Sequence, residues 1–444
     1  MKKVFGKLAS LCLTTTLLVG LMAGCGASGG KGSSAGENTS GSEQATSAKL
    51  EGANPGGSDG QVLQLNQAMP TGDMGKISKV NDMEKYTQED VEKVDRAIRA
   101  YTPSVSDGLL INNAEHFHYY ESLTSPVKEF YEAMQMVAED PVSADYYINV
   151  KLPNPITEEE FQKAYFMAYQ ALCFDHPEFF WLYNYSKASI LCGSEDFQSI
   201  YFSIPESYKT FEQDMNAFNQ AVDQFLAQID ANASDLEKTR QIHDKLCELV
   251  TYDYKVLEMG NDPAAYSDLA HSAYGVLVEN SRGDKNTAVC DGYSLAFQYL
   301  LTQSGIEAVL IPGKAGTSTS DMGGHAWNVV KLDGQWYEID STWDDNMTEL
   351  KDSLKPDTEG YDYFLEALTD QEYTEILSHY LFGLTTTQIK DYVPGEADYY
   401  VTKDGKYKLC LTGESKHYRA NEFTDMGGDS DLAGLAPDAT GSLK

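Results

Sequence analysis

Hydrophobic residues recur at helical spacing through most of the segment from residue 86 to residue 232. Thr157 and Glu160 have the spacing of a capping box, which predicts a helix that starts there and ends before Pro177. Weak alternation over residues 189–204 indicates a pair of strands. A later stripe of apolar residues predicts a packed helix: Phe211, Met215, Phe218, Val222, Phe225, Leu226 and Ile229. We therefore expect a mainly helical region over residues 86–232.

The pattern changes between residues 233 and 395, where helices are followed by closely spaced strands. We expect helices after Ser234 and over residues 273–278 and 295–304, and strands over residues 306–311, 325–332 and 335–341. The connection over residues 314–324 is expected to be a loop beside a cleft. This order favours an α+β domain in which a helix packs on an antiparallel sheet.

The Asp333-Gly334 pair stands between two alternating runs and predicts a two-residue hairpin turn. If Leu332 faces Gln335, then Trp327 faces Asp340. Side chains on one strand alternate between faces, so His325 shares a face with Trp327 and Asp340. Diagonal neighbours on paired strands lie roughly 7 Å apart at Cβ, which lets an imidazole reach a carboxylate. The hairpin alone therefore predicts an oriented His–Asp pair.

The two ends of the chain differ from this body. Residues 1–24 have a basic start, a short apolar core and small residues at the end, which is typical of a secretory signal peptide. The Leu-x-Ala-Gly-Cys sequence there resembles a bacterial lipobox, which implies lipidation of Cys25; the alternative is a plain signal peptide. Residues 25–85 are predicted to be a flexible tether, and residues 396–444 a short strand pair with a disordered tail. We expect the protein at the bacterial cell membrane, lipid-anchored, on the extracellular face.

The net charge and the number of cysteines bear on the expected partners and on the state of the thiols. The formal charge is −35, and loss of the three lysines in residues 1–24 makes it −38. Such a chain repels phosphate backbones, so nucleic acid is not an expected partner. Of seven cysteines, five remain after Cys12 and Cys25 are set aside: Cys173, Cys192, Cys247, Cys290 and Cys410. An odd number leaves at least one free thiol, and either disulfides or buried thiols fit the rest.

Cys290 is the candidate nucleophile, because a polar loop meets a predicted helix at this position. Backbone N–H groups at a helix start stabilise a thiolate, which is the reactive form of cysteine. His325 would exchange the proton with Cys290, and Asp340 would fix the imidazole tautomer. Tyr274 is a candidate oxyanion donor. The alternatives are a helix-start cysteine without a role, a structural strand histidine, and an aspartate that caps the next turn.

Other candidate features carry less chemistry. Trp327 and Trp343 either line a substrate cleft or fill the core. His116 and His118 lack a third ligand at ligand spacing, so no metal site is predicted there. The glycines at 313 and 316 lack the Lys-Ser/Thr ending of a nucleotide loop. No cofactor is expected.

Three motifs resemble those of bacterial transglutaminase-like proteins, over roughly residues 235–370. They are Cys290-Asp291-Gly292-Tyr293, Gly324-His325-Ala326-Trp327-Asn328, and Trp336-Tyr337-Glu338-Ile339-Asp340-Ser341-Thr342-Trp343, with Tyr252-Asp253-Tyr254 and Ala273-Tyr274-Gly275 upstream. One departure is Ser341, where many members have proline. The resemblance implies a papain-like fold whose helix carries Cys290 and whose antiparallel sheet carries His325 and Asp340.

Two functions remain open from the sequence. The first is a surface enzyme that acts on amide bonds of proteins or peptides through a thioacyl intermediate. Cell-wall peptide is one candidate substrate. Transfer to an amine would make it an acyltransferase, and transfer to water a peptidase or amidase. The second is a non-catalytic module that binds peptide or glycan in the same cleft. The oligomeric state is not determined by the sequence.

Overall fold

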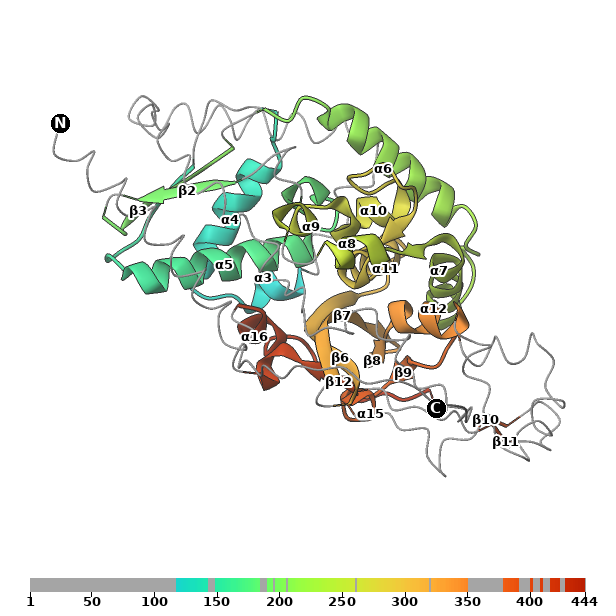
Figure 1. Cartoon of the computed structure of the whole chain (residues 1–444). Helices are drawn as coiled ribbons and strands as arrows, with labels where there is room; N and C mark the ends of the chain where they lie inside the picture. Colours follow the sequence, from blue (N-terminus) through green and yellow to red (C-terminus); the bar gives the residue numbers. More distant parts are fainter. Residues whose placement is uncertain are drawn as a thin grey trace, which may run out of the picture.

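The structure is a computed structural model (Figure 1). It describes residues 117–142, 148–183, 190–194, 196–204, 207–259, 262–318, 321–349, 378–390, 400–401, 408–409, 416–423 and 428–443. The predicted signal peptide, the tether, Cys25, His116 and Cys410 lie outside these ranges. Among the described residues, every helix is too short or too polar to traverse a lipid bilayer.

The N-terminal part combines helices with a small antiparallel sheet. Its elements are α3 (His118–Ser122), α4 (Val127–Ala138), β1 (Ile148–Lys151), α5 (Glu158–Asp175), η5 (Phe180–Tyr183), β2 (Leu191–Ser194), β3 (Ser199–Ser203) and α6 (Phe211–Leu226). The predicted strand pair is β2 and β3, and β1, which the sequence did not predict, completes the order β1-β3-β2. The capping box at Thr157 and Glu160 is present in both directions.

The second part has the predicted α+β architecture. Its helices are α7 (Asp235–Leu249), α8 (Tyr254–Glu258), α9 (Pro263–Tyr266), η6 (Leu269–His271), α10 (Ala273–Leu277), α11 (Cys290–Gln303), α12 (Ser341–Glu349), α15 (Thr386–Lys390), η7 (Ala420–Glu422) and α16 (Gly428–Ala433). Its strands are β4 (Thr251–Tyr252), β5 (Thr287–Ala288), β6 (Ala308–Ser318), β7 (Asp321–Leu332), β8 (Gln335–Ile339), β9 (Phe382–Leu384), β10 (Tyr400–Val401), β11 (Lys408–Leu409) and β12 (Lys416–Arg419).

A five-stranded antiparallel sheet with the order β12-β6-β7-β8-β9 organises this part. The β7–β8 register pairs Leu332 with Gln335, as the hairpin turn predicted. Asp333 and Gly334 both have positive φ, which a tight hairpin turn with the strand twist requires. The prediction of a loop over residues 314–324 is wrong, because β6 and β7 continue through most of it as a long hairpin.

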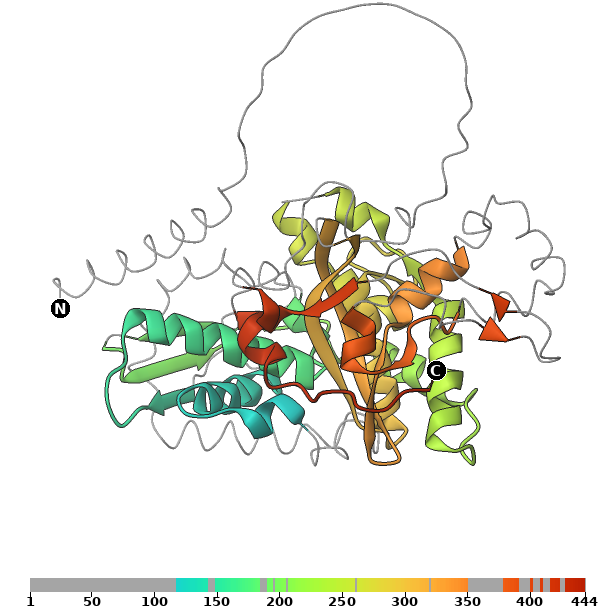
Figure 2. The same ribbon diagram turned by 90° about the horizontal axis from the view of Figure 1, so that it is seen from below.

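The core lies between α11 and the sheet, and it continues into the N-terminal part. Helix α11 buries almost every side chain from Asp291 to Leu301. Across the two parts, the Gln298 Nε2 amide donates to the Phe174 carbonyl at 2.6 Å. Figure 2 shows α4 and α5 on one side of the sheet and α7 on the other, with α16 beside α5. The N-terminal part is thus packed directly onto the part that carries the candidate nucleophile.

The prediction of a disordered tail is wrong for the described C-terminal residues. Strand β12 forms the edge of the central sheet against β6, and Leu432 in α16 is fully buried. Gly441 lies so close to the Tyr337 ring that a Cβ there would come within 2.4 Å of it. The glycine- and alanine-rich composition that suggested disorder therefore serves close packing. The predicted short strand pair is present as β10 and β11.

Candidate active site

Cys290 is the first residue of α11, and Val289 before it is extended. The Val289 N–H donates to the Ala270 carbonyl at 3.0 Å, which fixes the chain just before the cysteine. The Cys290 side chain is partly exposed, whereas Cys173 and Cys192 are buried. All four cysteines in the described part of the chain, the fourth being Cys247, are free thiols. The helix start and the partial exposure are the two features that a reactive thiol requires.

The three residues after Cys290 each contact a neighbouring element. A Cβ on Gly292 would lie 2.4 Å from the Ala270 carbonyl oxygen, so only glycine lets η6 approach α11 this closely. The Asp291 carboxylate contacts Nδ1 of His271 at 2.7 Å, which joins the same two elements. The Tyr293 hydroxyl donates to Asp345 of α12 at 2.7 Å. Each motif residue thus holds the nucleophile helix against a neighbour.

His325 and Asp340 meet as the hairpin register predicted. Nε2 of His325 lies 2.7 Å from Oδ2 of Asp340, and both side chains are buried. The other carboxylate oxygen, Oδ1, accepts the N–H groups of Thr342 and Trp343 at the start of α12. The His325 ring also has a hydrogen bond and a charge interaction with Cys290. Since Nε2 is occupied by Asp340, Nδ1 is the nitrogen that faces the thiol.

His417 of β12 is a fourth member of the site that the sequence analysis missed. Its Nε2 donates to Oδ2 of Asp340 at 2.8 Å, and its side chain is fully buried. The ring also packs against Trp343, at 5.0 Å between ring centroids. His417 stands 77 residues after Asp340, in a strand whose pairing no local pattern reveals.

The charges of these groups favour an ion pair. Burial by itself would lower the pKa of His325, but the Asp340 carboxylate and the hydrogen bond and charge interaction with Cys290 raise it to about 10. Burial would raise the pKa of Asp340, yet the two imidazoles hold it well below its usual range. Burial and the positive charge of His325 lower the pKa of His417. The site therefore holds one imidazolium, His325, between a carboxylate and the thiol.

The remaining predicted residues have different surroundings. Trp327 and Trp343 are both buried, and the Trp327 indole N–H donates to Glu338 at 2.6 Å. Both indole rings pack against the His325 imidazole ring. The Tyr274 ring packs against Phe180 of η5, which favours a structural role over the predicted oxyanion role.

Tyr252 lies near the nucleophile instead. Burial and then the charge of Cys290 raise the pKa of Tyr252 well above its usual range, so its hydroxyl stays protonated. The sequence signal for it was the Tyr252-Asp253-Tyr254 motif, which the resemblance included without assigning a role.

Within the described residues, two groups of side chains have ligand atoms within 4.8 Å of one another, as a metal site requires. One is His325, Asp340 and His417, where Oδ2 of Asp340 already contacts both rings at hydrogen-bond distance. The second group, His243, Asp244 and His379, shares no residue with the nucleophile site. The sequence predicted no metal at either group.

A thiol at a helix start, with an imidazole on one strand of an antiparallel pair and a carboxylate directly after the end of the next, is the arrangement of the papain-like, transglutaminase-like fold. Residues 223–341 match the family model described as the transglutaminase-like superfamily. The chain therefore carries a transglutaminase-like domain.

Two curated relatives match this chain over a stretch of similar length. The chain is 30% identical over 127 residues to kyphoscoliosis peptidase of Mus musculus, which is 27% of this chain and 17% of that protein. It is 29% identical over 123 residues to kyphoscoliosis peptidase of Homo sapiens, or 26% of this chain and 17% of that protein. The chain thus spans 17% of the length of these relatives.

A structure described as "Crystal structure of a TGase" is 15% identical, over 44% of this chain and 50% of that chain, with a TM-score of 0.24, too low to carry an inference.

Proposed function

We propose that the protein is an enzyme that acts on amide bonds of protein or peptide substrates through a thioacyl intermediate on Cys290. The observation that carries the proposal is the pair of hydrogen bonds that His325 forms, one with Cys290 and one with Asp340. Family membership of the domain supports acyl transfer by a cysteine, and the relatives named as peptidases support hydrolysis as one outcome.

In the proposed reaction each group of the site has one role. The Cys290 sulfur forms a bond to the amide carbon, and the carbonyl oxygen takes the negative charge. The C–N bond then breaks as Nδ1 of His325 gives its proton to the leaving amine. An amine or a water next attacks the thioester, His325 takes its proton, and Cys290 leaves as the thiolate. Asp340 keeps Nε2 of His325 protonated throughout.

The oxyanion needs donors that point at it before the reaction begins. The backbone N–H of Cys290, at the start of α11, is one donor. The Tyr252 hydroxyl is the second that we propose, in place of Tyr274, because β4 places Tyr252 opposite Ala288, two residues before Cys290. Replacing Tyr252 with Phe would lower kcat by about 10²- to 10³-fold if it supplies an oxyanion donor.

The test of this function is incubation of the chain with a peptide library and a labelled primary amine, with Cys290→Ala as control. Amine incorporation would define a transglutaminase, and cleavage a peptidase. If the wild type and Cys290→Ala bind peptide equally and neither turns it over, the protein is instead a non-catalytic peptide- or glycan-binding module.

We further propose that Cys25 is lipidated and holds the enzyme at the extracellular face of a bacterial membrane. The proposal rests on the signal-like residues 1–24 and their lipobox resemblance. Growth with a labelled fatty acid would label the wild type and leave Cys25→Ser unlabelled. Equal labelling of both, or of neither, would contradict the anchor.

A further inference from the structure

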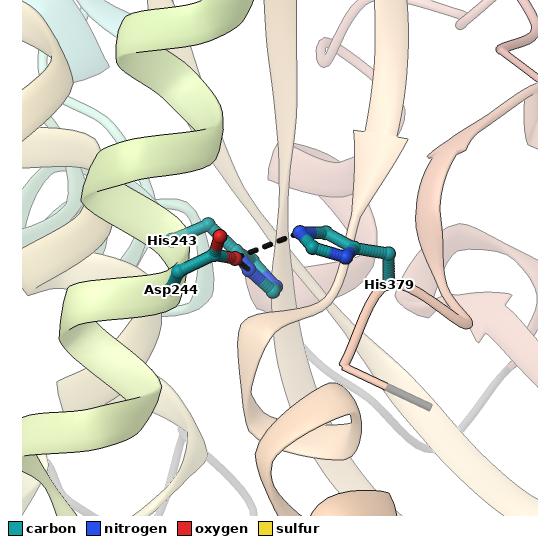
Figure 3. Close-up of side chains that lie close together, drawn as sticks. All are labelled: His243, Asp244 and His379. Atoms are coloured by element: carbon teal, nitrogen blue, oxygen red, sulfur yellow. Dashed lines mark hydrogen bonds and ion pairs between the residues drawn. The ribbon is translucent and has the colours of Figure 1, made fainter. Parts of the chain in front are cut away.

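A second cluster of imidazole and carboxylate groups joins α7 to the segment just before β9 (Figure 3). Figure 3 shows His243 and Asp244 on one helix and His379 approaching from the neighbouring segment. Oδ1 of Asp244 lies 2.7 Å from Nε2 of His379 and 3.0 Å from Nδ1 of His243. Three ligand atoms from two separate chain segments therefore converge on one point.

The His243 ring is held as a metal-ligating histidine is held. It is fully buried between the edges of Phe297 and Phe382, so its orientation is fixed. Its far nitrogen, Nε2, lies 3.2 Å from Oδ2 of the buried Asp344. The other oxygen of Asp344 accepts the Leu381 N–H at 2.7 Å. A carboxylate on the far nitrogen is the usual partner of a ligating imidazole, and it leaves Nδ1 directed at the cluster.

The charge at this point favours a cation. Oδ1 of Asp244 lies 3.0 Å from Nδ1 of His243, and Oδ2 of Asp344 lies 3.2 Å from its Nε2, so carboxylates contact both ring nitrogens. Two carboxylates this close to one imidazole attract a divalent ion.

We propose that His243, Asp244 and His379 form a zinc site with water as the fourth ligand. Two imidazoles and one carboxylate are a ligand set that zinc accepts, and the half-exposed Asp244 gives water access. Ligand atoms around tetrahedral zinc lie about 3.3 Å apart, given bonds of about 2.0 Å. The observed 2.7 and 3.0 Å contacts need to open by about 0.6 and 0.3 Å. The partly exposed side chains of His379 and Asp244 can provide this by small rotations.

The proposed ion would stabilise the catalytic domain at a site that does not include Cys290. It would fix the segment at His379, and hence Leu381, to α7, and through Asp344 it would reach α12. Helix α12 begins with the two N–H groups that bind Asp340. Zinc at this site is therefore expected to raise the melting temperature, because it binds only the folded chain.

The experiment is zinc titration of the full chain by calorimetry, with X-ray absorption to identify the ligands. The test variants are His379→Ala and Asp244→Asn, and the controls are His118→Ala and His325→Ala. We expect one equivalent of zinc with nitrogen and oxygen ligands at about 2.0–2.1 Å. Each test variant should bind at least ~100-fold more weakly, since removing a ligand exceeds the 10–100-fold effect of an outer-shell change. Both controls should bind as the wild type does.

Several results would overturn the zinc site. The zinc site is contradicted if the wild type binds no equivalent of zinc, or if both test variants bind zinc with unchanged affinity. His243, Asp244 and His379 would then form ion pairs without a metal. Sulfur ligands at about 2.3 Å would assign the metal to cysteines. Loss of binding in His325→Ala would move the site to the catalytic cluster. Circular dichroism of each variant confirms that it is folded, and Asp244→Asn keeps its side chain nearly unchanged in shape.

Discussion

Replacing Asp340 with Asn removes the charge that the active site depends on while keeping the side chain's shape. The amide oxygen can still accept the N–H groups of Thr342 and Trp343, so the start of α12 is retained. The pKa of His325 is about 10 against an ordinary 6.5. At about 1.4 kcal/mol per pKa unit, the 3.5-unit difference corresponds to about 5 kcal/mol of stabilisation of the imidazolium. Part of it comes from Cys290, so Asp340 supplies a few kcal/mol.

The expected result for Asp340→Asn is an alkylation rate at Cys290 that falls by about 100- to 1,000-fold at pH 7, since 1.4 kcal/mol is tenfold. The assay is iodoacetamide modification followed by mass spectrometry of the Cys290 peptide. The stabilisation at His325 is fully present below pH 6.5 and lost as the pH rises through about 10. Wild type and variant should therefore react at similar rates above pH 10. A rate within threefold of the wild type at pH 7 would refute the reasoning.

Three further changes test the packing around the site, each by urea unfolding. His417→Phe removes a donor to the buried catalytic carboxylate and should cost about 1.5–3 kcal/mol, with partial recovery in His417→Gln, which keeps an N–H donor. Equal stability of the Phe variant and the wild type would contradict this. Gly292→Ala forces a Cβ to within 2.4 Å of the Ala270 carbonyl and should cost at least about 1–3 kcal/mol; a neutral effect would contradict the close approach. Arg419→Met leaves the buried Glu338 carboxylate with only neutral donors, from Trp327 and Thr386, and should cost about 3–5 kcal/mol; adding Glu338→Gln should restore most of it.

The part of the site that could be predicted from the sequence is the part fixed by local geometry. The Asp333-Gly334 turn sets the β7–β8 register, and the register places His325 and Asp340 on one face. The helix that begins at Cys290 follows from the polar loop before it. Each of these depends on residues close together in the sequence, where turn chemistry and side-chain periodicity determine the outcome.

The part that could not be predicted depends on long-range pairing. His417 reaches Asp340 only because β12 pairs with β6, about a hundred residues earlier in the chain. Nothing in the short run that contains His417 distinguishes it from an exposed strand. The ion pair of Arg419 with the buried Glu338 depends on the same pairing. Composition misled the prediction for this region, since small residues allow close packing as readily as disorder.

The central claim is that Cys290 is an activated nucleophile, and competitive alkylation tests it most directly. The folded full chain is treated at neutral pH with limiting iodoacetamide, and labelling of each cysteine is followed by mass spectrometry. Burial raises the pKa of Cys173, Cys192 and Cys247, so these thiols should react slowly. We predict that Cys290 is labelled first and that His325→Ala abolishes its advantage. Labelling of Cys290 no faster than that of Cys173, Cys192 and Cys247 would contradict the claim.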